Sequence, residues 1–325
     1  MAAQTTEPLP SGYKLGEYII DRRIGGGGFS LVYLAFDLDG QPVAIKEYLP
    51  GGVVKRGDGG TVIPISEDKQ ASFRYGMKCF FDEGRALAGI RHPNVVRVVN
   101  FFRANGTVYM VMKYERGRTL QEHITTLKEP MRESFIRHVF VQLLNGLREV
   151  HTHKILHLDI KPSNVYIRTD GTPLLIDFGA SRQVLKHDLQ MASQMPTHNL
   201  QMASPMYTPG FAAPELYKAR DCLGPWTDIY AIGASMYACL AKEPPPPADE
   251  RLEKDRLAPT VKTFAGQYSN ALLELIDSLL KLDYTQRPQS VYAVQKRLIE
   301  LSIKSQRSKP TLLALIKERL TPTSR

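Results

Sequence analysis

The sequence is poor in cysteine and has no hydrophobic run long enough to cross a membrane. Its three cysteines, Cys79, Cys222 and Cys239, are widely spaced and match neither a zinc site nor a disulfide framework. We therefore expect reduced thiols and a cytoplasmic protein. The only long apolar run, Ile229 to Ala241, is too short for a transmembrane segment and predicts a buried helix. No basic-then-apolar leader opens the chain, so no secretory signal is predicted.

The charge balance excludes few partners by itself. A net charge of +9 is compatible with acidic partners or a membrane surface. However, the sequence has no basic stripe with interleaved aromatic residues, so we predict no nucleic-acid partner. A hydrophobic content of 43% and a charged content of 23% are ordinary for a soluble globular protein. The 325 residues are enough for a large core, either in one bilobed unit or in two domains.

The most informative stretch of the sequence runs from His157 to Asn164. It places an acid, a lysine and an amide on one short segment, as Asp159, Lys161 and Asn164. An acid that follows a histidine is by itself a weak signal, since such residues are usually solvated in turns. The interest of this segment therefore depends on the residues that come after it in the chain.

Two short apolar runs follow this segment, 165–167 and 174–176, with Asp170-Gly171 between them. This pattern predicts a β-hairpin. A hairpin of that length would return Asp177 to the same end as Asn164. Two carboxylates, an amide and an ammonium group would then share one small volume, which suits a divalent metal ion and phosphate.

Together with Asp177-Phe178-Gly179, this segment resembles the catalytic loop and metal-binding triplet of eukaryotic-like serine/threonine protein kinases, most closely the soluble bacterial ones. The resemblance covers roughly residues 17–304. It implies an α+β, bilobal protein-kinase fold in which a small β-rich N-lobe carries one main helix and the larger C-lobe is helical. The expected parts are a flexible N-terminal tail (1–16), the kinase domain (17–304; N-lobe 17–112, hinge 113–117, C-lobe 118–304) and a C-terminal tail (305–325).

A glycine cluster between two β-rich runs predicts a hairpin whose tip is almost all backbone. Such a tip can lie close over phosphates and donate N–H groups to them. In this sequence order it resembles the kinase glycine-rich loop, except that Ser30 stands where the family usually has its last glycine. We expect the loop to accommodate nucleotide with this serine, but to be stiffer or tilted. The nucleotide-binding residues that the resemblance implies are Ile24, Gly25, Gly26, Gly27, Gly28, Phe29, Ser30, Val32, Ala44, Lys46, Glu83, Met112, Lys113 and Glu115.

Lys46 ends an apolar strand, where a lysine is costly unless it is paired. The helical pattern from Phe73 to Ile90 carries Glu83 at the spacing of the family's helix glutamate, so we expect Glu83 to pair with Lys46. By position, Met112 would limit the depth of the adenine pocket. The backbone groups of Lys113 and Glu115 would bind the adenine edge.

The resemblance also implies the catalytic roles. Asp159 would accept or orient the proton of the acceptor hydroxyl, and Lys161 would hold the transferring phosphate. Asn164 and Asp177 would hold magnesium ions, with manganese as an alternative, against the triphosphate of ATP. Lys161, and Thr208 as the floor for the acceptor residue, are typical of kinases that act on serine or threonine. The partners implied are thus protein substrates with serine or threonine acceptors.

Three further sets of residues are assigned structural or regulatory roles by the resemblance. Leu87 would join His157 and Phe178 in an internal apolar stack. Leu158 occupies the place of an arginine that binds a phosphate on the activation loop in many family members. Because leucine cannot form that charge-assisted pair, we expect that loop phosphorylation is not the main on-switch. A buried ion pair is expected between Glu215 and Arg287.

Residues 189–199 and 200–210 are adjacent eleven-residue segments that share seven positions, which indicates a tandem duplication. Its prolines argue against a helix, so we expect an extended, mobile activation loop. Ser193, Thr197 and Ser204 are the candidate phosphosites and are preferred to Thr208.

Glycines and short β-rich runs in residues 50–72 predict a β-hairpin insertion absent from a minimal kinase. For this insertion, surface decoration is favoured over a docking site. Two other functions stay open, namely a non-catalytic pseudokinase scaffold and a small-molecule kinase. The sequence does not indicate the oligomeric state, the physiological substrate or the activating signal.

Overall fold

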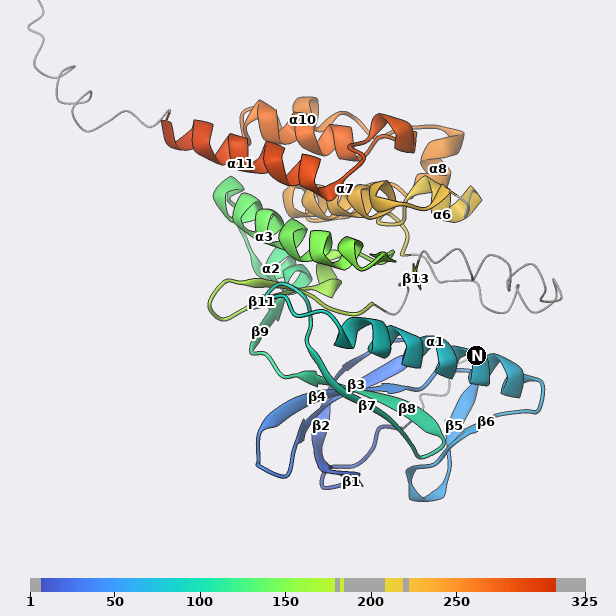
Figure 1. Ribbon diagram of the computed structural model, residues 1–325. Helices are drawn as coiled ribbons and strands as arrows, with labels where there is room; N and C mark the ends of the chain where they lie inside the picture. Colours follow the sequence, from blue (N-terminus) through green and yellow to red (C-terminus); the bar gives the residue numbers. More distant parts are fainter. Residues whose placement is uncertain (1–6, 179–181, 184–207, 219–221, 308–325) are drawn as a thin grey trace, which may run out of the picture. The chain divides into compact units, whose positions relative to one another are not determined.

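The computed structural model describes residues 7–178, 182–183, 208–218 and 222–307 (Figure 1). Two compact units divide the chain. One comprises the described residues up to Glu122 together with those from Gly146 to Thr208. The other comprises residues His123–Asn145 and the described residues from Pro209 onward.

The first unit is built on a six-stranded antiparallel sheet in the order β1-β2-β3-β4-β8-β7. Alternation of apolar residues along β3 and β4 buries one face, as a half-buried sheet requires. Its strands are β1 (Lys14–Leu15), β2 (Tyr18–Gly26), β3 (Ser30–Phe36), β4 (Pro42–Tyr48), β7 (Val98–Ala104) and β8 (Thr107–Lys113).

One long helix, α1 (Lys69–Ala88), runs across this sheet and contacts β7 and β8 (Figure 1). It begins four residues earlier than the predicted helical pattern. Phe73, Phe80 and Leu87 are buried on it at helical spacing. Phe81 meets Phe101 of β7 edge-on, with 4.7 Å between the ring centroids. The helix is thereby held against the sheet, and Glu83 lies on its buried side.

The predicted insertion forms a real hairpin of β5 (Val54–Arg56) and β6 (Val62–Pro64). A short 3-10 turn, Asp58–Gly60, joins the two strands. Val54 and Val62 are each only 3% exposed and belong to the apolar core on one face of the sheet. The hairpin therefore contributes to the core of this unit.

The expected loose tail is not observed from residue 7 onward. Leu9 and Leu15 are 3% and 1% exposed and belong to the same core. The backbone N–H of Gly12 donates to the carbonyl of Ile20, and β1 pairs with β2. The sequence prediction was wrong here because two isolated leucines among polar and proline residues gave no periodic signal, yet each fills a position in the core.

The first unit continues into the segment that carries the candidate catalytic residues. Strand β11 pairs with β12 and with β9, and β10 pairs with β13. These elements are β9 (Gly117–Thr119), β10 (Ile155–Leu156), the 3-10 turn Pro162–Asn164, β11 (Val165–Arg168), β12 (Pro173–Leu175) and β13 (Arg182–Gln183). The helices α2 (Leu120–Thr126) and α3 (Glu133–Thr152) precede β10 in the chain.

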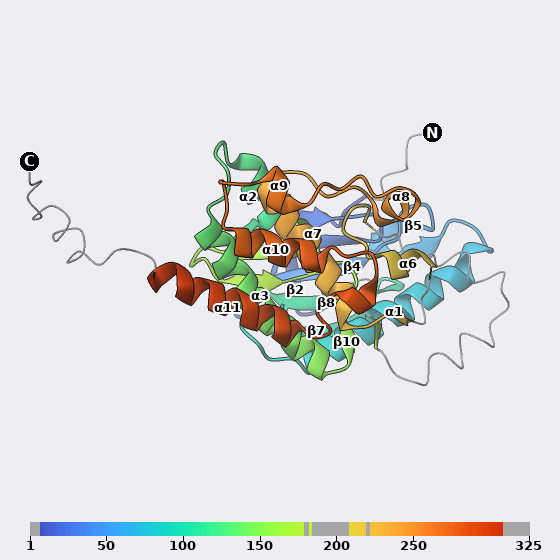
Figure 2. The same cartoon turned by 90° about the horizontal axis from the view of Figure 1, so that it is seen from above.

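The second unit is helical, and α7, α10 and α11 lie side by side in it (Figures 1 and 2). Its core helix is the predicted apolar run, in which residues 227–236 are all buried. At the start of α10 the Ser269 side chain accepts a hydrogen bond from the N–H of Leu272, as a helix cap does. Its helices after α3 are α6 (Pro214–Lys218), α7 (Pro225–Ala241), α8 (Ala248–Glu253), α9 (Thr260–Thr263), α10 (Asn270–Leu279) and α11 (Val291–Arg307).

The predicted pair of Glu215 and Arg287 is present in the second unit. The guanidinium donates two hydrogen bonds, Nη1 to Oε1 at 2.8 Å and Nη2 to Oε2 at 3.0 Å. The Thr227 hydroxyl also donates to Oε1 at 2.8 Å. The side chains of Glu215 and Arg287 are 3% and 0% exposed. This bidentate geometry satisfies both buried charges, so the pair links α6 to the segment before α11.

Candidate active site

A buried lysine lies at the centre of the candidate site. Lys46 is on β4, and its Nζ is 2.7 Å from Oδ1 of Asp177 and 3.5 Å from Oε1 of Glu83. The predicted Lys46–Glu83 pair is therefore present. The same ammonium lies 5.3 Å from the ring centroid of Phe80, a favourable cation–π arrangement.

Burial and charge act in opposite directions on these groups. Burial alone would lower the pKa of Lys46, but the carboxylates of Asp177 and Glu83 outweigh it and the pKa is raised. Burial raises the pKa of Glu83, the Lys46 ammonium opposes this effect, and the Asp177 charge adds to it. Lys46 thus stays protonated at neutral pH and holds two acids beside each other.

A second polar cluster joins the catalytic-loop segment to Thr208. The Lys161 ammonium is 2.8 Å from Oδ2 of Asp159 and donates to the Thr208 hydroxyl at 2.8 Å. That hydroxyl in turn donates to Oδ1 of Asp159 at 2.9 Å. The side chains of Asp159 and Lys161 are 20% and 23% exposed. An accepting carboxylate and a cation therefore lie side by side within reach of solvent.

The hairpin predicted after Asn164 is present, with Val165 paired to Leu175. The N–H of Ile176 donates to the Asn164 carbonyl at 3.0 Å. This bond brings the end of the hairpin back beside Asn164, as expected, and Asp177 follows directly. Asp177 has a φ of 59°, in the left-handed region. Non-glycine residues are uncommon there, and such residues are concentrated at functional sites.

An aromatic contact supports this corner of the site. The rings of His157 and Phe178 lie with centroids 4.3 Å apart, and both side chains are buried. The N–H of Asp159 is 3.4 Å from Nδ1 of His157. His157 thus links the residue after Asp177 to the backbone of Asp159. Leu87 is 2% exposed, and its place in the same stack stays a prediction.

The donor groups fit a magnesium ion. The Asn164 amide nitrogen donates to the carbonyl of Asp159 and to its Oδ2, at 2.9 and 3.0 Å. Its amide oxygen is thereby the atom left for a cation. The Asp177 side chain is 47% exposed and supplies carboxylate oxygens. Within the described ranges no group of three or more His, Cys, Asp or Glu residues could hold a metal.

The glycine cluster lies at the turn between β2 and β3. Gly26 has a φ of 149°, and a Cβ there would be 2.8 Å from the carbonyl oxygen of Ser30, so only glycine fits. Phe29 at the tip is 49% exposed. The expected nucleotide residues are distributed with Ile24, Gly25 and Gly26 on β2, Gly27, Gly28 and Phe29 in the turn, Ser30 and Val32 on β3, and Ala44 and Lys46 on β4.

The predicted hinge follows β8. Met112 is paired in register with Ala44 and is half-buried. The Glu115 carboxylate lies 3.1 Å from the Lys113 ammonium and 3.2 Å from the Arg168 guanidinium. Arg168 was not singled out from the sequence. It lies on β11, more than fifty residues further along the chain, and no local pattern connects it to Glu115.

Similarity to known proteins is consistent with this geometry. The family profile described as "Protein kinase domain" matches residues 18–299. The chain belongs to the protein kinase family. The predicted α+β kinase fold is therefore confirmed.

Individual kinases show the same relationship. The chain is 33% identical to the solved structure "PpkA-294 apo form", with a TM-score of 0.78, over 90% of this chain and 99% of that one. It is 29% identical over 302 residues to the serine/threonine-protein kinase Nek1 of Mus musculus, which covers 92% of this chain and 22% of the relative. It is 28% identical to the human hormonally up-regulated neu tumor-associated kinase, over 87% of this chain and 37% of the relative. This kinase chain thus spans well under half the length of these curated relatives.

Two parts of the sequence prediction have no structural account in this kinase. The candidate phosphosites Ser193, Thr197 and Ser204 lie outside the described residues. The same holds for the tail beyond residue 307. Among the helices that are described, none is long and apolar enough to cross a membrane.

Proposed function

We propose that this kinase is an ATP- and magnesium-dependent protein serine/threonine kinase that transfers the γ-phosphate of ATP to serine or threonine hydroxyls. The observation that carries the proposal is the pair of polar clusters within one unit. One joins Lys46 to Glu83 and Asp177, and the other joins Asp159 to Lys161 and Thr208.

The second cluster suits a transfer to an alcohol. The acceptor oxygen forms a bond to the γ-phosphorus as the bond between that phosphorus and the β,γ-bridging oxygen breaks, which releases ADP. The Asp159 carboxylate takes the hydroxyl proton. The Lys161 ammonium stabilises the negative charge on the transferring phosphoryl oxygens. Thr208 holds Asp159 and Lys161 in register with each other.

The first cluster suits the binding of a triphosphate. Lys46, held by Glu83, would turn from Asp177 to the phosphates, and Asn164 and Asp177 would then hold the metal. Magnesium held there would supply positive charge that neutralises the triphosphate. Backbone N–H groups of the glycine turn would contact the phosphates. The backbone groups of Lys113 and Glu115 would contact the adenine.

A substitution of Asp177 tests this assignment. The wild-type protein, incubated with labelled ATP and magnesium, should transfer phosphate to itself or to a generic serine/threonine substrate. Asp177→Ala should abolish the transfer. Asp39→Ala is the matched control, because Asp39 is an exposed acid in the turn between β3 and β4 and its loss changes the net charge equally. A wild-type chain that binds magnesium and nucleotide without transferring phosphate would favour the pseudokinase scaffold instead.

Autophosphorylation within the duplicated segment is part of the proposal. We expect phosphate on Ser193, Thr197 or Ser204 in preference to Thr208, since the Thr208 hydroxyl is bonded to both Asp159 and Lys161. Mass spectrometry of the protein after incubation with ATP measures this directly. Phosphate found only on Thr208 would contradict the expectation.

A further inference from the structure

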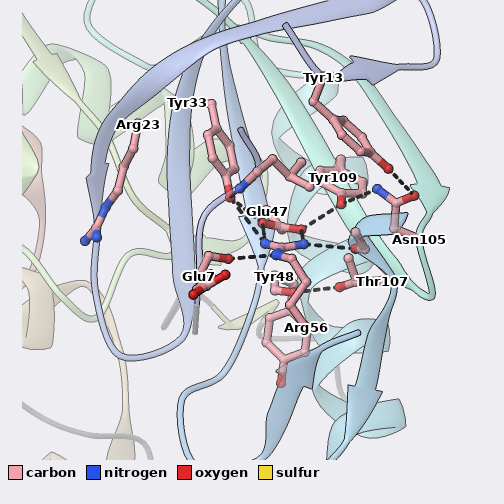
Figure 3. Close-up of polar contacts among 12 residues, drawn as sticks. Glu7, Tyr13, Arg23, Tyr33, Glu47, Tyr48, Arg56, Asn105, Thr107 and Tyr109 are labelled. Carbon is pink, nitrogen blue, oxygen red and sulfur yellow. Dashed lines mark hydrogen bonds and ion pairs between the residues drawn. The ribbon is translucent and has the colours of Figure 1, made fainter. Parts of the chain in front are cut away.

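The insertion hairpin is clamped to the strand that carries the nucleotide-binding lysine. Arg56 of β5 donates to both carboxylate oxygens of Glu47, from Nη1 to Oε1 at 3.0 Å and from Nη2 to Oε2 at 2.7 Å (Figure 3). Their side chains are 9% and 0% exposed. The hydroxyls of Tyr33 and Tyr109 donate to the same carboxylate, each at 2.7 Å. Glu47 directly follows Lys46, so this clamp fixes the end of β4.

The far end of the hairpin is also fixed. The Tyr13 hydroxyl donates to the carbonyl of Gly59 at 2.8 Å. It also lies 3.1 Å from the Asn105 side chain (Figure 3). The backbone N–H of Val62 donates to the Asn105 carbonyl at 2.7 Å. The hairpin is thus anchored to the unit at three places, on β5, at the turn and on β6. A hairpin that only decorated the surface would not need these anchors.

The residues that lead into the hairpin hold the glycine turn. The N–H of Leu49 donates to the Phe29 carbonyl and that of Gly51 to the Gly28 carbonyl, both at 2.8 Å. These bonds extend the β3–β4 pairing past its last strand pair and reach the tip of the turn. A glycine-rich tip has more conformational freedom to lose on binding a ligand than any other backbone. A fixed partner for that tip therefore reduces the ordering that a nucleotide must impose.

We propose that the insertion of residues 50–64 is a brace for the glycine-rich turn that raises the affinity for nucleotide. Arg56 is a positioning residue that anchors the brace to Glu47, and the N–H of Gly51 is the contact through which it acts. This inference rests on the proposed function, since it concerns the same nucleotide site. It predicts an effect on nucleotide binding without a direct effect on phosphate transfer, because neither residue touches Asp159 or Lys161 in the described structure.

Gly51 allows a precise test. The N–H of Val53 donates to the carbonyl of Pro50. The φ angle of Gly52 is 72°, whereas that of Gly51 is negative. This is the signature of a type II turn with Gly51 at its second position, where proline is favoured. Gly51→Pro should therefore keep the turn and remove the donor to Gly28, and the proline Cδ, in place of the amide hydrogen, would push the Gly28 carbonyl away from the hairpin. Gly51→Ala keeps the donor, and its Cβ would lie at an ordinary 3.5 Å from the Gly28 oxygen.

Binding of the non-hydrolysable analogue adenosine 5′-(β,γ-imido)triphosphate with magnesium, and steady-state phosphate transfer, should be measured on both variants in the full chain. For Gly51→Pro we expect the Kd for the analogue and the KM for ATP to rise by at least about 2-fold, the lower limit for the loss of one net hydrogen bond. The kcat should stay within twofold of wild type. Gly51→Ala should match wild type in all three. A Gly51→Pro variant that binds the analogue as wild type does would overturn the proposal.

A second variant guards against misfolding. The double substitution Glu47→Gln with Arg56→Gln removes both charges at once, so no buried charge is stranded. The tyrosine hydroxyls can still bond the amide. This variant should also bind the analogue more weakly while keeping kcat, and equal affinity would contradict the brace. A wild-type chain that fails to bind the analogue would refute the proposed function itself, whereas equal binding by wild type and variants would refute only the brace.

Discussion

Removal of one hydroxyl, that of Thr208, should separate acceptor positioning from nucleotide binding. Thr208→Val keeps the shape of the side chain but loses the oxygen that accepts from Lys161 and donates to Asp159. Hydrogen bonds to charged groups contribute about 1.5–3 kcal/mol each. Lys161 and Asp159 also contact each other directly at 2.8 Å, so we count one bond rather than two. Both side chains are about a fifth exposed, which favours the lower half of that range.

A loss of about 1.5–2 kcal/mol corresponds to about a 10- to 30-fold fall in kcat/KM. The measurement is steady-state transfer from ATP to a serine-containing peptide, with the KM for the peptide and for ATP determined separately. The KM for ATP should not change, since Thr208 contacts neither Lys46 nor Asp177 in the described structure. Thr208→Ser, which retains the hydroxyl, should stay within a few fold of wild type. Activity of Thr208→Val within twofold of wild type would refute the reasoning.

Three further outcomes are expected. Arg287→Met leaves the Glu215 carboxylate buried without its partner and should lower the free energy of unfolding by about 3–5 kcal/mol in urea denaturation; a change below about 1 kcal/mol would contradict it. Because Leu158 cannot bind a loop phosphate, phosphatase treatment should leave most of the activity, and a large loss would show that phosphorylation is the switch. Burial alone would raise the pKa of Glu133, but the hydrogen bonds from Ser269 outweigh this effect and the pKa is lowered. Ionised Glu133 therefore stabilises the folded protein at neutral pH, and this contribution is lost as the pH falls through the lowered pKa. Glu133→Gln should remove this part of the acid dependence of the urea midpoint.

Local patterns predicted the elements of this fold well. The Asp170-Gly171 hairpin and the insertion hairpin were both predicted from turn residues between apolar runs, and both are present. Helix α1 was found from its apolar face, although its first turn was missed because that turn contributes no buried residue before Phe73. Turn residues and the periodicity of apolar residues are local features, so a short stretch of one sequence is enough to identify them.

Long-range pairings were predicted only where the family resemblance supplied them. Lys46 with Glu83 and Glu215 with Arg287 were expected on that basis and are present as contacts. The clamp of Arg56 on Glu47 was not expected. Nothing in the sequence distinguishes these two residues from the many exposed charges, and only the curl of the hairpin against the sheet buries them together.

The three-way contact around Lys46 affects how an inactive form of this protein should be made. Asp177 and Glu83 both face that single ammonium, and the charge of Asp177 already raises the pKa of Glu83. Deleting the lysine would leave two carboxylates facing each other, and they would repel each other or share a proton. Such a variant would alter the resting arrangement as well as the chemistry. Under the proposed function, substitution of Asp159 by asparagine should silence transfer, and it leaves this trio untouched.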